Sequence, residues 1–223
     1  MKCTQIINRR GMSCLNYDLK KRDLKSIQEV TEDYISNHRA DCIKELDYYR
    51  NQPSFIKAIE VAALAKTRDG SKHDHQWRIP VDVLKQAQIA LVLIADELRA
   101  CKTFRELHDR VELEIGKIKG IGKLTIYDTA HRIGAYLGLE PEFVYVHAGV
   151  KKGAKALGFK GRSIILKEEL PKEFSRLKPY EIEDCLCIYA DKLEHISADN
   201  NRQSLLENEI VTKKLTHESQ NHE

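Results

Sequence analysis

Residues 118–125 of the chain read Ile118-Lys119-Gly120-Ile121-Gly122-Lys123-Leu124-Thr125, so that two glycines bracket one apolar residue. Glycine adopts positive φ readily and lets a ligand approach the backbone closely. If Ile121 packs inwards and fixes the turn, the helix expected after Gly122 presents unpaired N–H groups and the positive end of its dipole. Together these features predict a site for a phosphate group.

An ordinary tight turn between two packed helices is the alternative interpretation, and a lone pair of glycines would favour it. The flanking basic residues Lys119 and Lys123 and the polar Thr125 favour the phosphate site instead. We therefore expect nucleic-acid contacts from Lys119, Gly120, Ile121, Gly122, Lys123 and Thr125.

Apolar residues recur at helical spacing on both sides of this turn. We predict helices over Asp23–Tyr49 with a break near His38, Ser54–Thr67, Pro80–Ala100, Phe104–Leu113, Leu124–Leu137, Gly149–Leu157 and Pro179–His195. The helix over 80–100 is apolar nearly all round, which predicts a central position. Phe143 to Val146 is the one candidate strand, so the predicted fold class is all-α, a helical bundle.

The chain has 223 residues, of which 42% are hydrophobic, enough to bury a core. We predict an irregular N-terminal lead-in over 1–20, an all-helical domain over 21–196 and a polar tail over 197–223. Residues 1–10 contain no apolar run, so we do not expect a secretory signal there, and no run of ~20 apolar residues predicts a membrane span. The six cysteines match no zinc pattern. We expect free thiols, no metal, no membrane partner and a cytoplasmic location.

The glycine-bracketed stretch, extended to Ile126, resembles the hairpin of helix-hairpin-helix DNA glycosylases of the endonuclease III type, whose usual form is L-P-G-V-G-x-K-T-A. The resemblance extends over 54–157, where Val144-Tyr145-Val146-His147 stands in place of the family's V-D-T-H. It implies a helix-hairpin-helix motif over 113–137 in a glycosylase-like fold that binds duplex DNA, in repair or maintenance. It implies no cofactor, with a monovalent cation at the hairpin as the alternative.

The residues that carry the family's chemistry differ in this chain. Leu124 stands where bifunctional members have a lysine nucleophile, and Lys123 lies one residue earlier, rotated by ~100° around the helix. Tyr145 stands where the family has its aspartate, and a tyrosine supplies no carboxylate. Glu142 and Asp128 are the nearby carboxylates that could act as catalytic residues instead, so whether the chain is an enzyme stays open.

Two further segments are candidates for nucleic-acid contacts. Residues 150–162 hold five basic residues and no acidic one, so Lys151, Lys152 and Lys155 would extend the phosphate contacts if this segment flanks the hairpin. A solvated helix face is the alternative. The family's loop corresponding to 72–78 approaches the minor groove, which makes Gln76 or Trp77 a candidate wedge between bases. A core or loop anchor is the alternative for Trp77.

These observations leave three hypotheses. The first is a DNA-binding protein that contacts the phosphate backbone with little base readout. The second is a DNA glycosylase or lyase-type repair enzyme with a rearranged catalytic carboxylate. The third is an interaction module in which the same fold packs against a protein partner, which the modest net charge of +3 favours.

Overall fold

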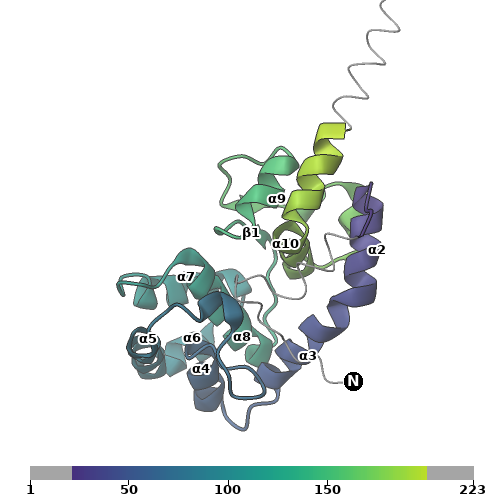
Figure 1. Ribbon diagram of the computed structural model, residues 1–223. Helices are drawn as coiled ribbons and strands as arrows, with labels where there is room; N and C mark the ends of the chain where they lie inside the picture. Colours follow the sequence, from purple (N-terminus) through teal and green to yellow (C-terminus); the bar gives the residue numbers. More distant parts are fainter. Residues whose placement is uncertain (1–21, 200–223) are drawn as a thin grey trace, which may run out of the picture.

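The computed structural model of the protein describes residues 22–199, which are mostly helical with one two-stranded sheet (Figure 1). The predicted all-α class is therefore confirmed. The predicted lead-in over 1–20 and the part of the tail beyond 199 lie outside the described residues. Residues 197–199, which we assigned to the tail, are still helical.

The elements follow one another along the chain with short connections. In order they are α2 (Ile27–Asn37), α3 (Arg39–Arg50), α4 (Phe55–Ala63), η1 (Asp74–Gln76), α5 (Val81–Leu93), α6 (Ala95–Ala100), α7 (Phe104–Ile115), α8 (Lys123–Leu137), β1 (Val144–Tyr145), α9 (Lys151–Ala156), β2 (Ile164–Ile165), η2 (Lys167–Glu169), η3 (Lys172–Arg176) and α10 (Pro179–Ile188).

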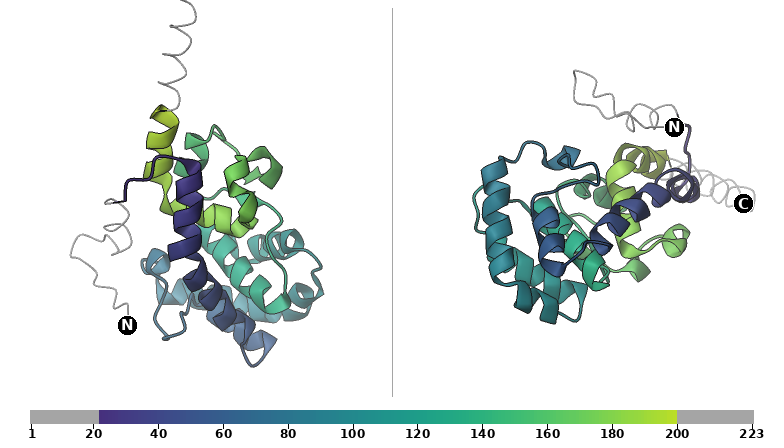
Figure 2. Two further views of the ribbon diagram at one scale, coloured as in Figure 1. Left: turned by 90° about the vertical axis from the view of Figure 1, so that its right-hand side faces the viewer. Right: turned by 90° about the horizontal axis from the view of Figure 1, so that it is seen from below.

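Apolar side chains gather in two cores. The first lies among α3, α4, α5, α7 and α8, and the second among α2, β1, β2, α9 and α10. Helices α2 and α3 meet at His38, where the predicted break is confirmed. Figures 1 and 2 show these two helices as one bent rod along the edge of the molecule, reaching from the second core to the first.

The short strand β1 lies between the two cores, so the candidate strand over 143–146 is confirmed in part. It pairs antiparallel with β2, with Val144 opposite Ile165 and Tyr145 opposite Ile164. Successive side chains of a strand point to opposite faces. Accordingly Val144 belongs to the second core and Tyr145 to the first.

The predicted central position of the helix over 80–100 is wrong. The segment breaks at Ile94 into α5 and α6, and α5 buries only Leu84, Ala87 and Leu91. Its other face is open, with Ile89 exposed to 61% and Leu93 to 81%. The reason is that α5 packs on α4 and α7 from one side and lies at the margin of the molecule (Figure 1).

Helix length and cysteine state can be read directly from the described residues. None of the helices within residues 22–199 combines the length and the apolarity needed to cross a bilayer. The cysteines in the same range, Cys42, Cys101, Cys185 and Cys187, are all free thiols, as expected.

Candidate functional site

The connection between α7 and α8, residues 116–122, is called the glycine turn here. Gly120 has φ +103°, a conformation that L side chains rarely adopt, and a Cβ there would lie 3.5 Å from Val83 at the start of α5. Backbone conformation rather than space therefore requires glycine at this position. Ile118 and Ile121 pack against the first core, which confirms that Ile121 anchors the turn from inside.

The first turn of α8 has unpaired backbone donors. Gly122 is its N-cap residue, with extended backbone and no side-chain cap, and the first amide paired within the helix is that of Ile126, 3.1 Å from the Gly122 carbonyl oxygen. Among the described residues, none accepts a hydrogen bond from the amides of Lys123, Leu124 or Thr125. A Cβ added at Gly122 would meet no atom within 4 Å, so the approach to these donors is open.

Basic side chains surround the glycine turn. Lys117, Lys119 and Lys123 are exposed, and none of them forms an ion pair with another described residue. Thr125 differs, because the residue is only 5% exposed. Its burial argues against the phosphate contact predicted for the Thr125 side chain.

The basic segment on α9 belongs to the second core, where α9 packs against α10. Lys151 and Lys155 are exposed. Lys152 is paired, with its Nζ 2.5 Å from an oxygen of Asp191 and 3.0 Å from one of Glu194. The sequence segment 150–162 therefore suggested more free positive charge than the structure has, because acidic residues of another segment neutralise Lys152.

The loop before α5 contains both candidate wedge residues, and one is buried whereas the other is exposed. Gln76 is 1% exposed, and its Oε1 accepts a hydrogen bond from Nη1 of Arg132 at 2.9 Å. Trp77 is 63% exposed and lies beside the guanidinium of Arg78. Gln76 is therefore a buried partner of Arg132, which argues against its role as a wedge, whereas Trp77 is accessible for that role.

Asp128 belongs to the same buried network. Its Oδ2 lies 2.7 Å from Nε2 of His75 and 3.7 Å from Nη2 of Arg132. Burial alone would raise the pKa of Asp128, but the hydrogen bond with His75 and the charge of Arg132 outweigh it and lower the pKa below its ordinary value. Asp128 is therefore an ionised carboxylate that holds η1 against α8.

Glu142 also has a structural partner. Its Oε1 accepts a hydrogen bond from the backbone amide of Phe104 at 3.0 Å, at the start of α7. A carboxylate at this position satisfies an unpaired amide and complements the positive end of the helix dipole. The catalytic roles of Glu142 and Asp128 stay predictions, and both side chains have roles in the fold.

A pocket lies directly beside the glycine turn, and we call it the turn pocket. Its cavity of about 180 Å³ is lined by residues of α7, the first turn of α8, the strand segment 145–147 and the segment 163–164. Lys123 and Tyr145 line it, whereas Glu142 and Asp128 do not. The carboxylates in its wall are Asp109 and Glu112 of α7. Sequence reasoning missed both, because charged residues on an amphipathic helix carry no local mark of a site.

Unpaired polar atoms gather in the turn pocket. Within residues 22–199, the buried side-chain nitrogen and oxygen atoms without a hydrogen-bond partner include the hydroxyls of Tyr127 and Tyr145 and the Nδ1 atoms of His108 and His147. All four residues line this pocket. A buried polar group left unpaired costs about 1–3 kcal/mol. Such a concentration therefore indicates that a polar ligand or water belongs there.

His147 has one paired and one unpaired ring nitrogen. Its Nε2 lies 2.6 Å from Oε1 of Glu183, and both residues are buried. Burial lowers the pKa of His147 and raises the pKa of Glu183 well above its ordinary value. Both shifts favour an uncharged pair, which fixes the orientation of the imidazole ring and leaves its Nδ1 without a hydrogen-bond partner.

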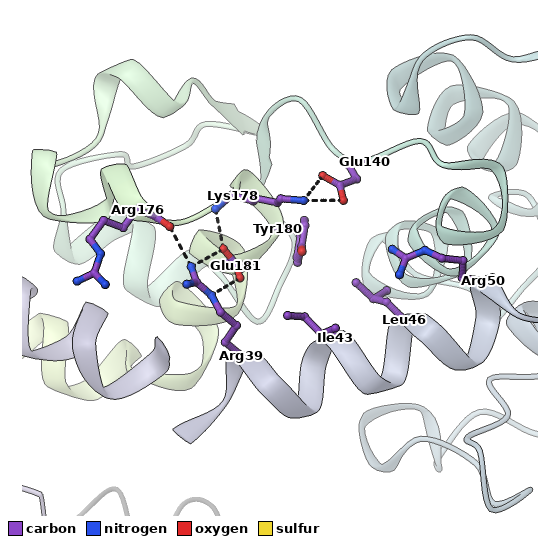
Figure 3. A pocket seen from close by; sticks show the side chains of 9 residues that line it. All are labelled: Arg39, Ile43, Leu46, Arg50, Glu140, Arg176, Lys178, Tyr180 and Glu181. Carbon is purple, nitrogen blue, oxygen red and sulfur yellow. Dashed lines mark hydrogen bonds and ion pairs between the residues drawn. The ribbon is translucent and has the colours of Figure 1, made fainter. Parts of the chain in front are cut away.

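A larger cavity of about 450 Å³ lies between α3 and the segment leading into α10 (Figure 3). Two ion pairs lie in its wall: Nε of Arg39 is 2.7 Å from Glu181, and Nζ of Lys178 is 2.7 Å from Glu140. No residue of the glycine turn lines this cavity.

No protein-family model matches the chain, and comparisons with curated proteins and with solved structures find no match either.

Proposed function

We propose that residues 113–137 form a helix-hairpin-helix element through which the protein binds the phosphate backbone of duplex DNA, in a role in DNA repair or maintenance. The observation that carries this proposal is the uncapped start of α8, where three successive amides have no acceptor among the described residues and Gly122 leaves the space in front of them open. Backbone amides at a helix N-terminus are a recurrent phosphate site.

The surroundings of these amides support the same function. The exposed Lys119 and Lys123 place positive charge on both sides of the donors. Lysine acts as a point charge towards phosphate and lacks the fixed fork of donors that arginine offers. Binding is therefore expected to tolerate changes of DNA sequence, since phosphate contacts position a protein without specifying bases.

Fluorescence anisotropy with a labelled duplex of about 20 base pairs tests this proposal. We expect saturable binding whose logarithmic affinity falls linearly with the logarithm of salt concentration, with a slope near −0.9 for each phosphate neutralised. Gly122→Val should remove binding without unfolding the protein, because the backbone there is extended and a Cβ at this position meets no atom within 4 Å.

The comparison of Gly122→Val with the unmodified chain decides the outcome. Melting temperatures followed by circular dichroism serve as the control for folding. Equal DNA affinity in both proteins would overturn the proposal. Absence of binding by the unmodified chain, or affinity that salt leaves unchanged, would favour a protein partner for this surface instead.

A second candidate is a DNA glycosylase or lyase-type enzyme, and the turn pocket is the observation that favours it. The pocket adjoins Lys123 and has Tyr127 and Tyr145 in its wall. Incubation of the pure protein with duplexes carrying a panel of damaged bases tests this candidate. Release of free base, lost in a Tyr145→Phe variant, would support it, and the absence of release from every substrate would exclude it for that panel.

A further inference from the structure

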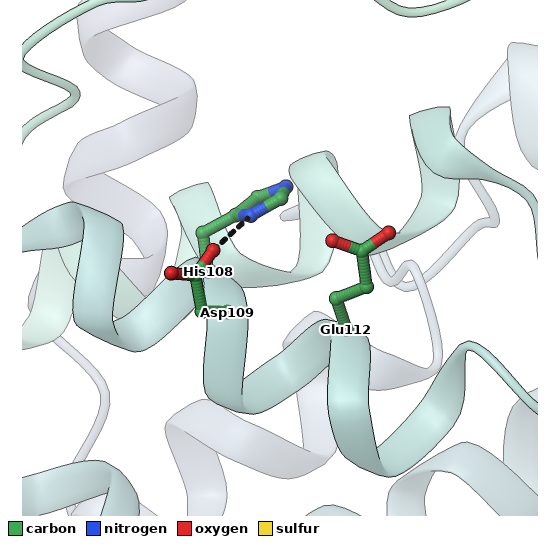
Figure 4. Close-up of side chains that lie close together, drawn as sticks. All are labelled: His108, Asp109 and Glu112. Atoms are coloured by element: carbon green, nitrogen blue, oxygen red, sulfur yellow. Dashed lines mark ion pairs between the residues drawn. The ribbon is translucent and has the colours of Figure 1, made fainter. Parts of the chain in front are cut away.

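We infer that the protein binds one divalent transition-metal cation at His108, Asp109 and Glu112 of α7. The ligand-competent atoms of these three side chains all lie within 4.8 Å of one another. Figure 4 shows the three side chains close together along α7. The helix sets this arrangement, because residues one turn apart share a face and the side chain next in the chain lies close beside the first.

The donor set indicates the class of cation. One imidazole nitrogen and two carboxylate oxygens suit Mn²⁺, Fe²⁺ or Zn²⁺ better than an oxygen-only cation such as Ca²⁺ or a thiolate-bound ion. Three protein ligands leave further coordination positions open for water or another oxygen ligand. Those positions would face the turn pocket, since all three residues line it.

The hydrogen-bonding capacity of His108 is not met by the two neighbouring carboxylates. Nδ1 of His108 lies 3.5 Å from Oδ1 of Asp109, which is ion-pair distance, yet this nitrogen is buried and has no hydrogen-bond partner. Asp109 and Glu112 are exposed on the rim. A buried imidazole nitrogen that has no hydrogen-bond partner and lies near two carboxylates has the arrangement that a cation would complete.

An independent observation comes from two tyrosines that line the same pocket. Tyr145 is 7% exposed, its hydroxyl has no hydrogen-bond partner, and its ring lies 4.7 Å from the ring of His108. Tyr127 is 2% exposed and its hydroxyl is likewise unpaired. Water or an anion bound to the cation's open positions would supply partners for these buried hydroxyls.

The remaining charges of the pocket place a limit on affinity and indicate what else binds. Arg105 and Lys123 line the same pocket and disfavour a lone cation there. The same two residues would stabilise an anionic oxygen ligand on the metal. The site is therefore best suited to a cation that carries water or a phosphate-type oxygen towards Lys123.

Electron paramagnetic resonance with MnCl₂ as the probe tests the inference on the full chain. The signal of free Mn²⁺ disappears on binding, so a titration gives the number of sites and their affinity. We expect Asp109→Asn and Glu112→Gln each to weaken one site at least tenfold and to leave folding intact, because both side chains are exposed. Glu114→Gln removes the same charge from the same helix outside the pocket and should leave the affinity unchanged.

Nuclear magnetic resonance with substoichiometric Mn²⁺ locates the site. Paramagnetic broadening should reach the amide signals of His108 and Tyr145 first and leave those of Lys172, on η3, unaffected. Absence of a saturable site in the unmodified chain would overturn the inference. So would equal affinity in the Glu112→Gln and Glu114→Gln variants, or broadening centred elsewhere. None of these readouts involves DNA, so the test of the metal site is independent of the test of the proposed function.

Discussion

Replacement of Gly122 by aspartate should strengthen the fold and weaken DNA binding at the same time. Gly122 is the N-cap of α8, it has the extended backbone typical of that position, and no side chain caps the helix. An aspartate there would accept hydrogen bonds from the amides of Leu124 or Thr125. These are the donors that we assign to a DNA phosphate.

The expected gain in stability follows from capping energies. An aspartate at the N-cap stabilises a helix by a few tenths of a kcal/mol relative to glycine, and its charge adds about 0.3–1 kcal/mol at the positive end of the dipole. The sum is about 1 kcal/mol, which corresponds to an increase of about 2–4 °C in melting temperature for a chain of this size.

The expected loss of affinity is larger. Hydrogen bonds to a charged group contribute about 1.5–3 kcal/mol, and repulsion between the new carboxylate and the phosphate adds to the loss. Since about 1.4 kcal/mol corresponds to a factor of ten, the dissociation constant should rise by about 10- to 150-fold. Differential scanning calorimetry and anisotropy titrations measure the two effects on the same preparations.

Two matched variants separate capping from charge. The asparagine of Gly122→Asn has nearly the same shape as aspartate and caps the helix without a charge. This variant should therefore weaken binding less than Gly122→Asp does. Lys172→Gln lowers the net charge by one at an exposed position on η3, remote from the glycine turn in sequence, and should leave affinity unchanged. A stabilised Gly122→Asp protein with undiminished DNA affinity would refute the assignment of these amides. A destabilised one would refute the open-cap geometry.

Three further outcomes are expected. Lys123→Gln should lower DNA affinity several-fold and reduce the salt slope by about one phosphate contact, whereas Lys152→Gln, whose lysine is already paired with two acids, should change neither in the same anisotropy assay. Burial raises the pKa of Asp184 from 3.8 to about 8. The folded state therefore favours the protonated carboxyl, and this contribution to stability is complete below about pH 4 and is lost as the pH rises towards 8. The melting temperature of Asp184→Asn, relative to that of the unmodified chain, should therefore rise from pH 5 to about pH 8. A constant difference in melting temperature across this range would contradict the raised pKa. Glu142→Gln should cost about 0.3–1 kcal/mol in urea unfolding because α7 loses a negative charge at its start, where Glu142 accepts a hydrogen bond from the amide of Phe104; an unchanged free energy of unfolding would contradict this role.

Local features of this protein could be predicted from its sequence. The glycine turn, the inward position of Ile121 and the break at His38 each depend on a few neighbouring residues. Backbone conformation and side-chain periodicity act over that same short range, so a window of several residues contains the information. The all-α class follows from the same periodicity.

The tertiary structure alone decided which polar side chains pair with one another and which helix faces stay exposed. Glu142 meets an amide 38 residues earlier, His75 meets Asp128 across 53 residues, and Lys152 meets Asp191 across 39. The turn pocket likewise draws its wall from four segments, and α5 is open on one face because α4 and α7 pack against the other. Whether a charge is free, paired or aimed into a cavity depends on which distant segments meet, and helical periodicity specifies the face that each helix buries without specifying its neighbour.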